Sequence, residues 1–355
     1  MTDTIRRVAI VGASSAVAPR HLEALLALPS TEVVALVEVD PNKAERLRLA
    51  HPEIAVYPQA ADIDQDGIDL AVVCVPDFAH GPVVVECLDR GWNVLCEKPL
   101  TDDVALAEDL FAHADKVGLL LAVGYQRRFM LAKLGEQIVN GLIGDLYWVD
   151  AWWLRRAGHP ASRREFTRRG LGVRGDLVPH LLSQTLQFLD PGQLVVQARD
   201  WRISPGWRSE DVARLTVRDD KGVELQAHVA YDKPHVDAVD DCGIACYGTL
   251  GSIHVQLPTT HDQLWANRNP PTLFSRDGSP ARKLDPLPST QQCHLLQAQA
   301  VIDALTAGSA PAEQQAAEMT LIRTVAAAQA SATWRGVAVP IENLGTAVGK
   351  RRYAS

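Results

Sequence analysis

The stretch Arg7–His21, RVAIVGASSAVAPRH, decides the fold of this chain. After Arg7, Val8–Val11 form a continuous apolar run that ends at Gly12, and helical spacing of apolar residues begins after the turn and lasts to Leu28. A run without strand alternation is typical of a parallel sheet, because helices cover both faces of such a sheet. The stretch therefore predicts a buried strand, a tight turn and a helix.

The same unit repeats through the first 125 residues. Strands are predicted at Arg7–Val11, Val33–Val39, Asp69–Val75, Trp92–Cys96 and Leu119–Val123, with helices at His21–Leu28, Asn42–Ala50, Pro82–Arg90 and Val104–Val117. Strands that alternate with helices in this way predict a doubly wound α/β domain, which binds its ligands at the carboxyl ends of the strands.

The bulk composition limits the classes of function. A length of 355 residues suggests two domains, and 47% hydrophobic with 22% charged residues is ordinary for a globular protein. The net charge of −8 argues against sequence-independent binding of nucleic acid, which needs a basic surface. No apolar run reaches the roughly 20 residues that span a membrane.

The cysteines and the N-terminus predict a cytoplasmic protein. The start, MTDTIRRVAIVG, lacks the apolar core of a signal peptide, and small thiols beside apolar runs suit a reducing compartment. Cys242 and Cys246 have no second pair at zinc-ligand spacing, so no metal site is expected.

The turn after the first strand is a degenerate version of a dinucleotide-binding loop. The usual fingerprint is G-x-G-x-x-G, and only Gly12 remains in register, in a loop that is one residue longer. Ser14 and Ser15 are small and can donate to a phosphate, although an ordinary turn without a ligand has the same pattern. Glu38 lies where an acid binds the adenosine ribose, which favours NAD over NADP, unless it is simply a solvated acid at a strand end.

A lysine ends the fourth predicted strand. The stretch Gly91–Thr101, GWNVLCEKPLT, places Lys98 at the ligand-binding edge of the sheet, where a partly desolvated ammonium needs partners. A lysine that reaches past the strand end into solvent is the alternative. Glu-Lys-Pro at this place resembles the motif of the glucose–fructose oxidoreductase, inositol dehydrogenase and rhizopine-catabolism family, known as Gfo/Idh/MocA.

The resemblance extends over essentially the whole chain. Four further segments are similar to parts of this family: Val75–His80, Gly124–Phe129, Leu154–Gly158 and Tyr247–Ser252. The resemblance implies a Rossmann domain over residues 1–125 and a substrate-binding and oligomerisation domain over residues 126–355. The family's second domain is an open, mostly antiparallel sheet.

The pattern after residue 125 agrees with a sheet that has helices on one side. The alternation at 148–153 is a strand signature. Further strands are predicted at Leu194–Ser204, Ala213–Val217, Val223–Tyr231, Gly243–Tyr247 and Ser252–Leu257, a loop at about Asn267–Pro288, and helices at Leu295–Thr306 and Ala312–Ala332.

An acid and a histidine are predicted on one helix of this domain. Asp176 is a good N-cap, Pro179 is tolerated in a first turn, and residues four apart, such as Asp176 and His180, share a helical face. Histidine is suited to proton transfer near neutral pH. A capping acid and a surface histidine are the alternative, against which the segment resembles the family's D-x-x-x-H motif.

The resemblance implies a mechanism and a set of site residues. His180 takes the hydroxyl proton during alcohol oxidation, Lys98 hydrogen-bonds the same oxygen, and Asp176 positions the substrate and His180. The implied cofactor-binding residues are Gly12, Ser14, Ser15, Ala16, Glu38, Pro76, Asp77, His80, Glu97, Lys98 and Gln126. The implied substrate-binding residues are Lys98, Arg127, Arg155, Arg156, Asp176 and His180.

For two groups of residues, an interpretation without a ligand is also open. Arg155 and Arg156, with Arg163 and Arg164, can equally form a solvated basic loop. Trp148, Trp152 and Trp153 can stack on a sugar, although the packed or subunit-facing surface of the sheet is favoured.

The expected function is that of an NAD-dependent oxidoreductase. The substrate is expected to be a polyol, sugar, amino sugar or cyclitol, and the assembly a homodimer or homotetramer. One alternative is a sensor or co-regulator that binds the dinucleotide without turnover, which the degenerate loop would support. Another is a relative that keeps its cofactor bound for internal redox chemistry or hydrolysis.

Overall fold

The computed structural model describes residues 5–63, 67–156, 172–204, 207–233, 240–257, 269–308 and 312–344. The chain divides into two compact units. The first unit comprises Met1–Gln126 and Gln291–Met319, and the second comprises Arg127–Thr290 and Thr320–Ser355.

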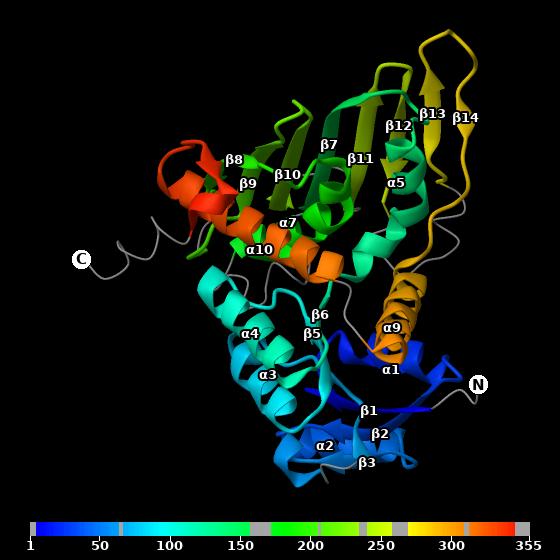
Figure 1. Ribbon diagram of the computed structural model, residues 1–355, viewed down its shortest axis with the longest axis vertical. Coiled ribbons are helices and arrows are strands. Elements are labelled where there is room, and N and C mark those ends of the chain that lie inside the picture. Colours follow the sequence, from blue (N-terminus) through cyan, green and yellow to red (C-terminus); the bar gives the residue numbers. More distant parts are fainter. Residues whose placement is uncertain are drawn as a thin grey trace. The chain divides into compact units, whose positions relative to one another are not determined.

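The first unit is built on a parallel sheet of six strands in the order β3-β2-β1-β4-β5-β6 (Figure 1). The strands are β1 (Arg6–Val11), β2 (Thr31–Val37), β3 (Ala55–Tyr57), β4 (Leu70–Val73), β5 (Asn93–Glu97) and β6 (Leu121–Gly124). This is the strand order of a dinucleotide-binding domain, with the order reversing between β1 and β4. The prediction of a doubly wound α/β domain is confirmed. The three-residue β3 was not predicted, because so short a run has no readable period.

Helices cover both faces of this sheet. They are α1 (Ala18–Leu26), α2 (Pro41–Ala50), α3 (His80–Asp89), α4 (Val104–Val117) and α9 (Thr290–Ala307), with short 3₁₀ turns η1 (Ala60–Asp62) and η3 (Asp77–Ala79). Asp40 and Asp103 cap α2 and α4 by accepting backbone N–H groups of the first turns. In Figure 1, α3 and α4 lie together on one side of the sheet, and α1 and α9 on the other.

The helix α9 belongs to the core of the first unit although it lies far along the chain. Its apolar residues Ala298, Val301 and Ile302 are buried in one cluster with Leu22 of α1 and Val8 of β1. The C-terminal third of the chain therefore contributes to the same hydrophobic core as the first strand.

The second unit is a nine-stranded sheet in the order β14-β13-β12-β11-β7-β10-β9-β8-β15. The strands are β7 (Leu146–Arg156), β8 (Val195–Trp201), β9 (Val212–Arg218), β10 (Glu224–Lys233), β11 (Asp241–Gly248), β12 (Gly251–Gln256), β13 (Thr272–Ser275), β14 (Arg282–Lys283) and β15 (Val339–Pro340). Within the described residues, β7 and β10 pair in parallel and every other pair is antiparallel. The mostly antiparallel sheet is confirmed.

One segment of this sheet corrects an expectation. Strands β13 and β14 lie in the stretch that was expected to be loop. They have four and two residues, and Leu273 is their one buried apolar side chain, so alternation along the sequence is too brief to detect.

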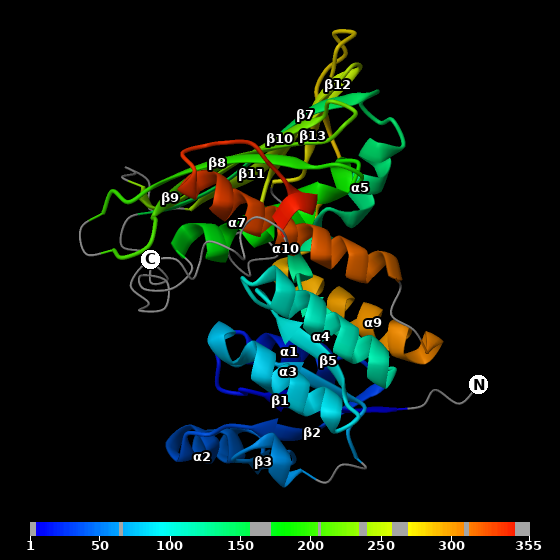
Figure 2. The same ribbon diagram turned by 60° about the vertical axis from the view of Figure 1, so that its left-hand side comes forward.

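Helices cover one face of the second sheet (Figure 2). They are α5 (Ala132–Val139), α7 (Gly172–Thr185) and the part of α10 (Ala312–Thr333) that belongs to this unit, with 3₁₀ turns η4 (Gln126–Met130), η6 (Leu186–Phe188) and η7 (Ile341–Asn343). The side chains of Val149, Ala151 and Trp153 on β7 are buried, whereas those of Trp148 and Trp152, which alternate with them, are half-buried. The period of two therefore divides the strand between a helix-covered face and an open face.

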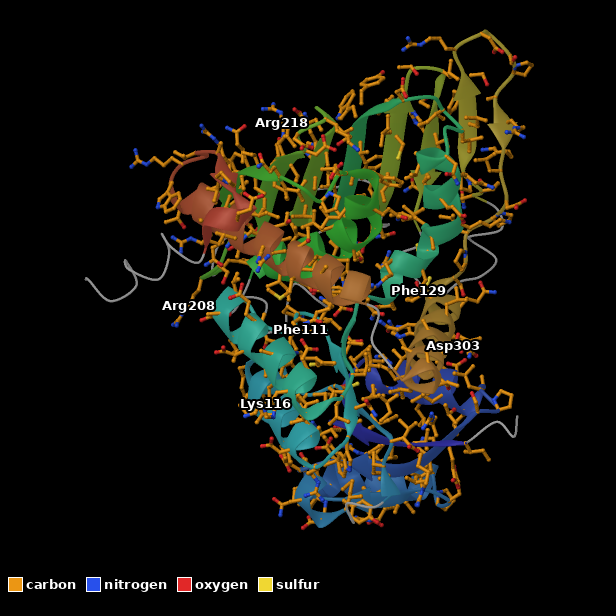
Figure 3. All side chains as sticks on the ribbon, in the orientation of Figure 1. Phe111, Lys116, Phe129, Arg208, Arg218 and Asp303 are labelled. Carbon is orange, nitrogen blue, oxygen red and sulfur yellow. The ribbon has the colours of Figure 1, made fainter. Side chains whose placement is uncertain are left out.

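The open face carries polar pairs between neighbouring strands. The Nε of Arg218 on β9, labelled in Figure 3, donates to Oε2 of Glu224 on β10 at 2.6 Å. The Nε2 of His228 on β10 lies 3.0 Å from Oδ1 of Asp150 on β7. Such cross-strand pairs stabilise a sheet surface that no helix covers.

Over the described part of the chain, every helix falls short of the length and apolar character needed to cross a membrane.

Candidate active site

The turn after β1 lies at the carboxyl ends of two neighbouring parallel strands, β1 and β4. Gly12 follows β1 with φ +82°, and a Cβ at this residue would lie 2.8 Å from the backbone C of Cys74 and the N of Val75, which follow β4. Only glycine fits here, because both the positive φ and the close backbone approach exclude a side chain. The single glycine kept from the fingerprint is the one that this turn requires.

Glu38 is tied to the turn by hydrogen bonds. It follows β2 and is 7% exposed. Its Oε2 accepts the backbone N–H of Ser14 at 3.3 Å and the hydroxyl of Ser14, and its Oε1 accepts the N–H of Asp40 at 2.9 Å. The structure therefore brings together two residues that the sequence assigned to the cofactor. Of the other two loop residues, Ser15 accepts the N–H of Ala18 at the start of α1, and Ala16 is exposed.

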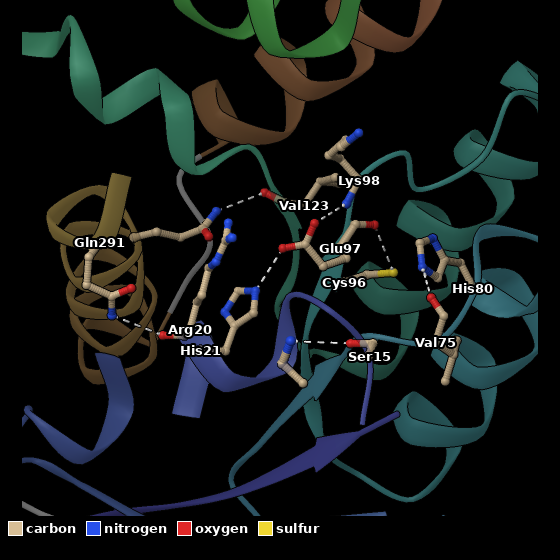
Figure 4. Close-up of polar contacts among 12 residues, drawn as sticks. Ser15, Arg20, His21, Val75, His80, Cys96, Glu97, Lys98, Val123 and Gln291 are labelled. Carbon is tan, nitrogen blue, oxygen red and sulfur yellow. Dashed lines mark hydrogen bonds and ion pairs between the residues drawn. The ribbon is translucent and has the colours of Figure 1, made fainter. Parts of the chain in front are cut away.

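A buried ion pair supports the strand end that carries Lys98 (Figure 4). Oε1 of Glu97 lies 2.8 Å from Nε2 of His21 on α1, and Oε2 of Glu97 accepts the backbone N–H of Lys98 at 3.1 Å. The ring of His294 on α9 meets the ring of His21 edge-on at 5.0 Å. The side chain of Lys98 extends away from this pair in Figure 4.

Neighbouring groups keep the carboxylate of Glu97 ionised. Burial raises the pKa of Glu97, but the hydrogen bond from His21 and the charges of His21, His294 and Lys98 outweigh it, and the pKa is lowered overall. Glu97 is therefore an ionised anchor that joins α1 and β5. Neither histidine was predicted here, because each lies on a helix without a recognisable motif.

His80 links two strand-end loops. Its ring is buried, with Nδ1 2.7 Å from the carbonyl oxygen of Pro99 and Nε2 2.9 Å from that of Val75. The ring thus holds together the chain after β4 and the chain after β5. Pro76 and Asp77 begin the turn η3 between these points.

Gln126 ends the main segment of the first unit. It is buried, and its Oε1 has no hydrogen-bond partner among the residues for which positions are described. A buried amide oxygen of this kind is available to a ligand.

The helix α7 carries Asp176 and His180 but begins earlier than expected. It starts at Gly172, so Asp176 lies inside the helix and is not its N-cap, and Pro179 is interior. The first turn is held by Glu210, whose carbonyl oxygen accepts the N–H of Val173 at 3.0 Å and whose Oε1 accepts the N–H of Arg174 at 3.2 Å. These bonds come from a distant loop and replace the cap that Asp176 was expected to supply.

The carboxylate of Asp176 accepts hydrogen bonds from side chains on two strands. Its Oδ2 accepts the hydroxyl of Tyr231 on β10 and Nη1 of Arg155 on β7, the latter at 3.2 Å. The same Nη1 of Arg155 lies 3.1 Å from the Tyr231 hydroxyl oxygen. Because β7 and β10 are parallel neighbours, their ends bring Arg155 and Tyr231 to one side of α7. Tyr231 was not predicted, since the sequence showed it only as a strand residue.

His180 lies beside an aromatic ring that two arginines also approach. Its ring centroid is 5.5 Å from that of Trp153. The guanidinium carbons of Arg127 and Arg155 lie 4.3 Å and 5.2 Å from the Trp153 centroid. The arrangement offers an acid–base group, a carboxylate, cationic donors and an apolar ring face to a polar ring-shaped molecule.

The three tryptophans of β7 have different surroundings. Trp153 belongs to the His180 cluster, whereas Trp148 stacks on Tyr247 at 4.8 Å on the open face. The Nε1 of Trp152 donates to Oδ1 of Asp241 at 2.7 Å. The three rings therefore divide between the covered face, which holds the buried Trp153, and the open face, which holds the half-buried Trp148 and Trp152.

Some expected residues lie outside the description. The side chain of Arg156 and the whole of Arg163 and Arg164 are not among the described residues. Within the described ranges, no group of three or more histidines, cysteines and acids is placed to hold a metal ion. Burial raises the pKa of Cys242 and of Cys246 to about 12, as in an apolar interior.

Comparison with known families agrees with this arrangement. Residues 6–125 match "Oxidoreductase family, NAD-binding Rossmann fold", and residues 131–254 match "GFO/IDH/MocA C-terminal domain". The chain belongs to the Gfo/Idh/MocA oxidoreductase family. The resemblance noted from the sequence is confirmed, and the first unit contains the NAD-binding Rossmann domain of this family.

Relatives of this Gfo/Idh/MocA protein include named dehydrogenases. An uncharacterised oxidoreductase of Schizosaccharomyces pombe is 30% identical over 260 residues, covering 69% of each chain. The D-glucoside 3-dehydrogenase of Escherichia coli is 31% identical over 196 residues, covering 53% of this chain and 55% of that enzyme. An Agrobacterium radiobacter oxidoreductase, solved with NAD+, L-tartaric acid and magnesium, shares the fold with a TM-score of 0.82 at 20% identity, covering 96% of this chain and 100% of that one.

Proposed function

We propose that this protein is an NAD-dependent oxidoreductase that interconverts a secondary alcohol and a ketone on a sugar, an amino sugar or a cyclitol. The observation that carries the proposal is the cluster on the helix-covered face of the second sheet. There Asp176, Arg155 and Tyr231 share hydrogen bonds, and His180 lies against Trp153. The relative named D-glucoside 3-dehydrogenase supports the same class of substrate.

The roles follow from the chemistry of each group. The nicotinamide, when bound, accepts or returns a hydride. His180 takes the proton of the substrate hydroxyl during oxidation and gives it back during reduction. Lys98 donates a hydrogen bond to the reacting oxygen and stabilises the negative charge that develops on it. Asp176 accepts from a neighbouring substrate hydroxyl, and Arg155 and Tyr231 hold its carboxylate in place.

The preference for NAD over NADP is supported by the end of β2. The carboxylate of Glu38 repels a 2′-phosphate, and the next residue, Val39, is 79% exposed and uncharged. The assigned cofactor residues Gly12, Ser14 and Glu38 come together at one turn, which suits the adenosine half of the molecule.

The open face of the second sheet supports a homo-oligomer, a dimer or a tetramer. A row of rings crosses it from Trp148 through Tyr247 and His254 to Phe274, with neighbouring centroids 4.8, 5.6 and 5.2 Å apart. A second copy would remove this apolar surface from water. Light scattering after gel filtration tests it, and a monomer at micromolar concentration would refute it.

A cytoplasmic location is part of the proposal. All six cysteines are free and buried, which suits a reducing compartment.

A substrate panel tests the reaction. Polyols, aminosugars and cyclitols are scanned for reduced-nicotinamide absorbance with NAD and with NADP in parallel. We expect His180→Ala to lower turnover by about 10²–10⁴-fold while NAD binding is kept. His228→Ala, on the open face of the second sheet, is the matched control and should keep turnover. Cofactor binding without turnover across the panel would instead identify a sensor.

A further inference from the structure

The carboxylate of Glu38 has little capacity left for a ligand. A carboxylate has two oxygens with about four acceptor sites in all. Three are filled by protein donors: the N–H and the hydroxyl of Ser14 on Oε2, and the N–H of Asp40 on Oε1. The residue is also nearly buried, so water does not compete freely for it. Within the described part of the chain, no other hydrogen bond fills the fourth site, which is on Oε1.

The adenosine ribose needs more than one acceptor site on the carboxylate of Glu38. It presents the 2′-hydroxyl, which an acid at the end of β2 binds as an acceptor, and next to it the 3′-hydroxyl, which is within reach of the second oxygen of the same carboxylate. Both hydroxyls can be held only if one of the three protein donors leaves Glu38. The two backbone N–H groups are fixed by the loop and by the start of α2, whereas the Ser14 hydroxyl can rotate about its Cα–Cβ bond.

The position of Ser14 makes this competition specific to the present chain. Ser14 stands two residues after Gly12, where the dinucleotide fingerprint has its second glycine. A glycine there keeps the backbone N–H but has no hydroxyl. The serine therefore adds to the ribose-binding acid a donor that the fingerprint lacks.

We propose that the Ser14 hydroxyl is an internal competitor of the ribose for Glu38 and thereby sets the affinity of this protein for NAD. The inference rests on the proposed use of NAD. With Ser14 bound to Glu38, one ribose hydroxyl is held, and holding the second requires Ser14 to turn away. Removing the hydroxyl should tighten NAD binding about tenfold, the range of one hydrogen bond to a charged group.

Calorimetric titration of the full chain with NAD, without substrate, tests the proposal. The variant is Ser14→Ala, which keeps the backbone N–H to Glu38. Thr306→Ala is the matched control, because it removes a hydroxyl that donates to the carbonyl oxygen of Ile302 within α9 of the same unit and is not assigned to the cofactor, and Ser14→Thr retains the hydroxyl. The second ligand is NAD that lacks the adenosine 2′-hydroxyl, because its one remaining hydroxyl fits the one free site.

We expect Ser14→Ala to tighten NAD about tenfold and the 2′-deoxy analogue less than twofold, with both controls at wild-type affinity. Unchanged NAD affinity in Ser14→Ala would overturn the proposal, and weaker affinity would also overturn it and make the hydroxyl a phosphate ligand. An equal gain for both ligands would overturn it too, since the ribose would not be involved. Absence of NAD binding in every variant, wild type included, would refute the proposed function as well, which separates the two failures.

Discussion

Replacing Glu97 with glutamine tests the buried anchor beneath Lys98. The change removes one charge and keeps the shape of the side chain. The amide oxygen can still accept the N–H of Lys98, now 3.1 Å from Oε2, but the contact of 2.8 Å with Nε2 of His21 loses its charged partner. His21 is then buried next to a neutral group.

The size of the effect follows from burial. Deleting one partner of a buried ion pair costs about 3–5 kcal/mol, because the other is left without compensation. Glutamine retains a hydrogen bond to the Lys98 N–H, so we expect Glu97→Gln to lower the free energy of unfolding of the first unit by about 1–3 kcal/mol. Glu97→Ala removes both bonds and should reach the larger range.

The pH dependence of stability shows whether the charge of Glu97 stabilises the folded state. The pKa of Glu97 is lowered from its ordinary value of 4.5 in the folded protein, so its ionisation stabilises the fold above that pH. This contribution is lost as the pH falls through the lowered pKa. The difference in stability between wild type and Glu97→Gln should therefore shrink as the pH falls below 4.5.

Urea unfolding followed by circular dichroism measures this difference. The matched control is Asp89→Asn, which breaks the 2.8 Å pair of Asp89 with His113 in the same unit, where the side chain of Asp89 is 58% exposed. An exposed pair should contribute no more than about 1 kcal/mol. The reasoning is refuted if Glu97→Gln at pH 7 costs no more than Asp89→Asn, or if its cost does not change below pH 4.5.

Three further predictions concern other parts of the site. Gly12→Ala should abolish measurable NAD binding in a calorimetric titration, because its Cβ would lie 2.8 Å from backbone atoms of Cys74 and Val75 at φ +82°; wild-type affinity would contradict this. Tyr231→Phe should lower kcat/KM by about tenfold, through loss of its hydrogen bond to Asp176, with NAD affinity unchanged, and steady-state kinetics on a substrate from the panel would show it. Burial raises the pKa of Cys74 and Cys96, so neither thiol should react with iodoacetamide at pH 8 in the native protein, and mass spectrometry that finds them alkylated without urea would contradict their burial.

Local patterns in the sequence determined much of the first unit. Apolar runs without alternation predicted five of its six strands, since a parallel sheet buried on both faces leaves that mark on each strand. The same runs placed Glu38 and Lys98 at strand ends, because a polar residue that stops a buried strand must lie at the sheet's edge. In the second unit, alternation predicted β7, and β-rich segments predicted β8 to β12.

Only the tertiary structure decided which distant residues meet. An apolar helix face shows that α9 packs on something, but it does not say that its partner is the core around Val8. The start of α7 at Gly172 depends on Glu210, and the partners of Asp176 and Glu97 come from Tyr231 and His21. These hydrogen bonds span 36 to 76 positions of sequence, and the one between Ser14 and Glu38 spans 24. They follow from strand order and packing, for which a single sequence has no local signal.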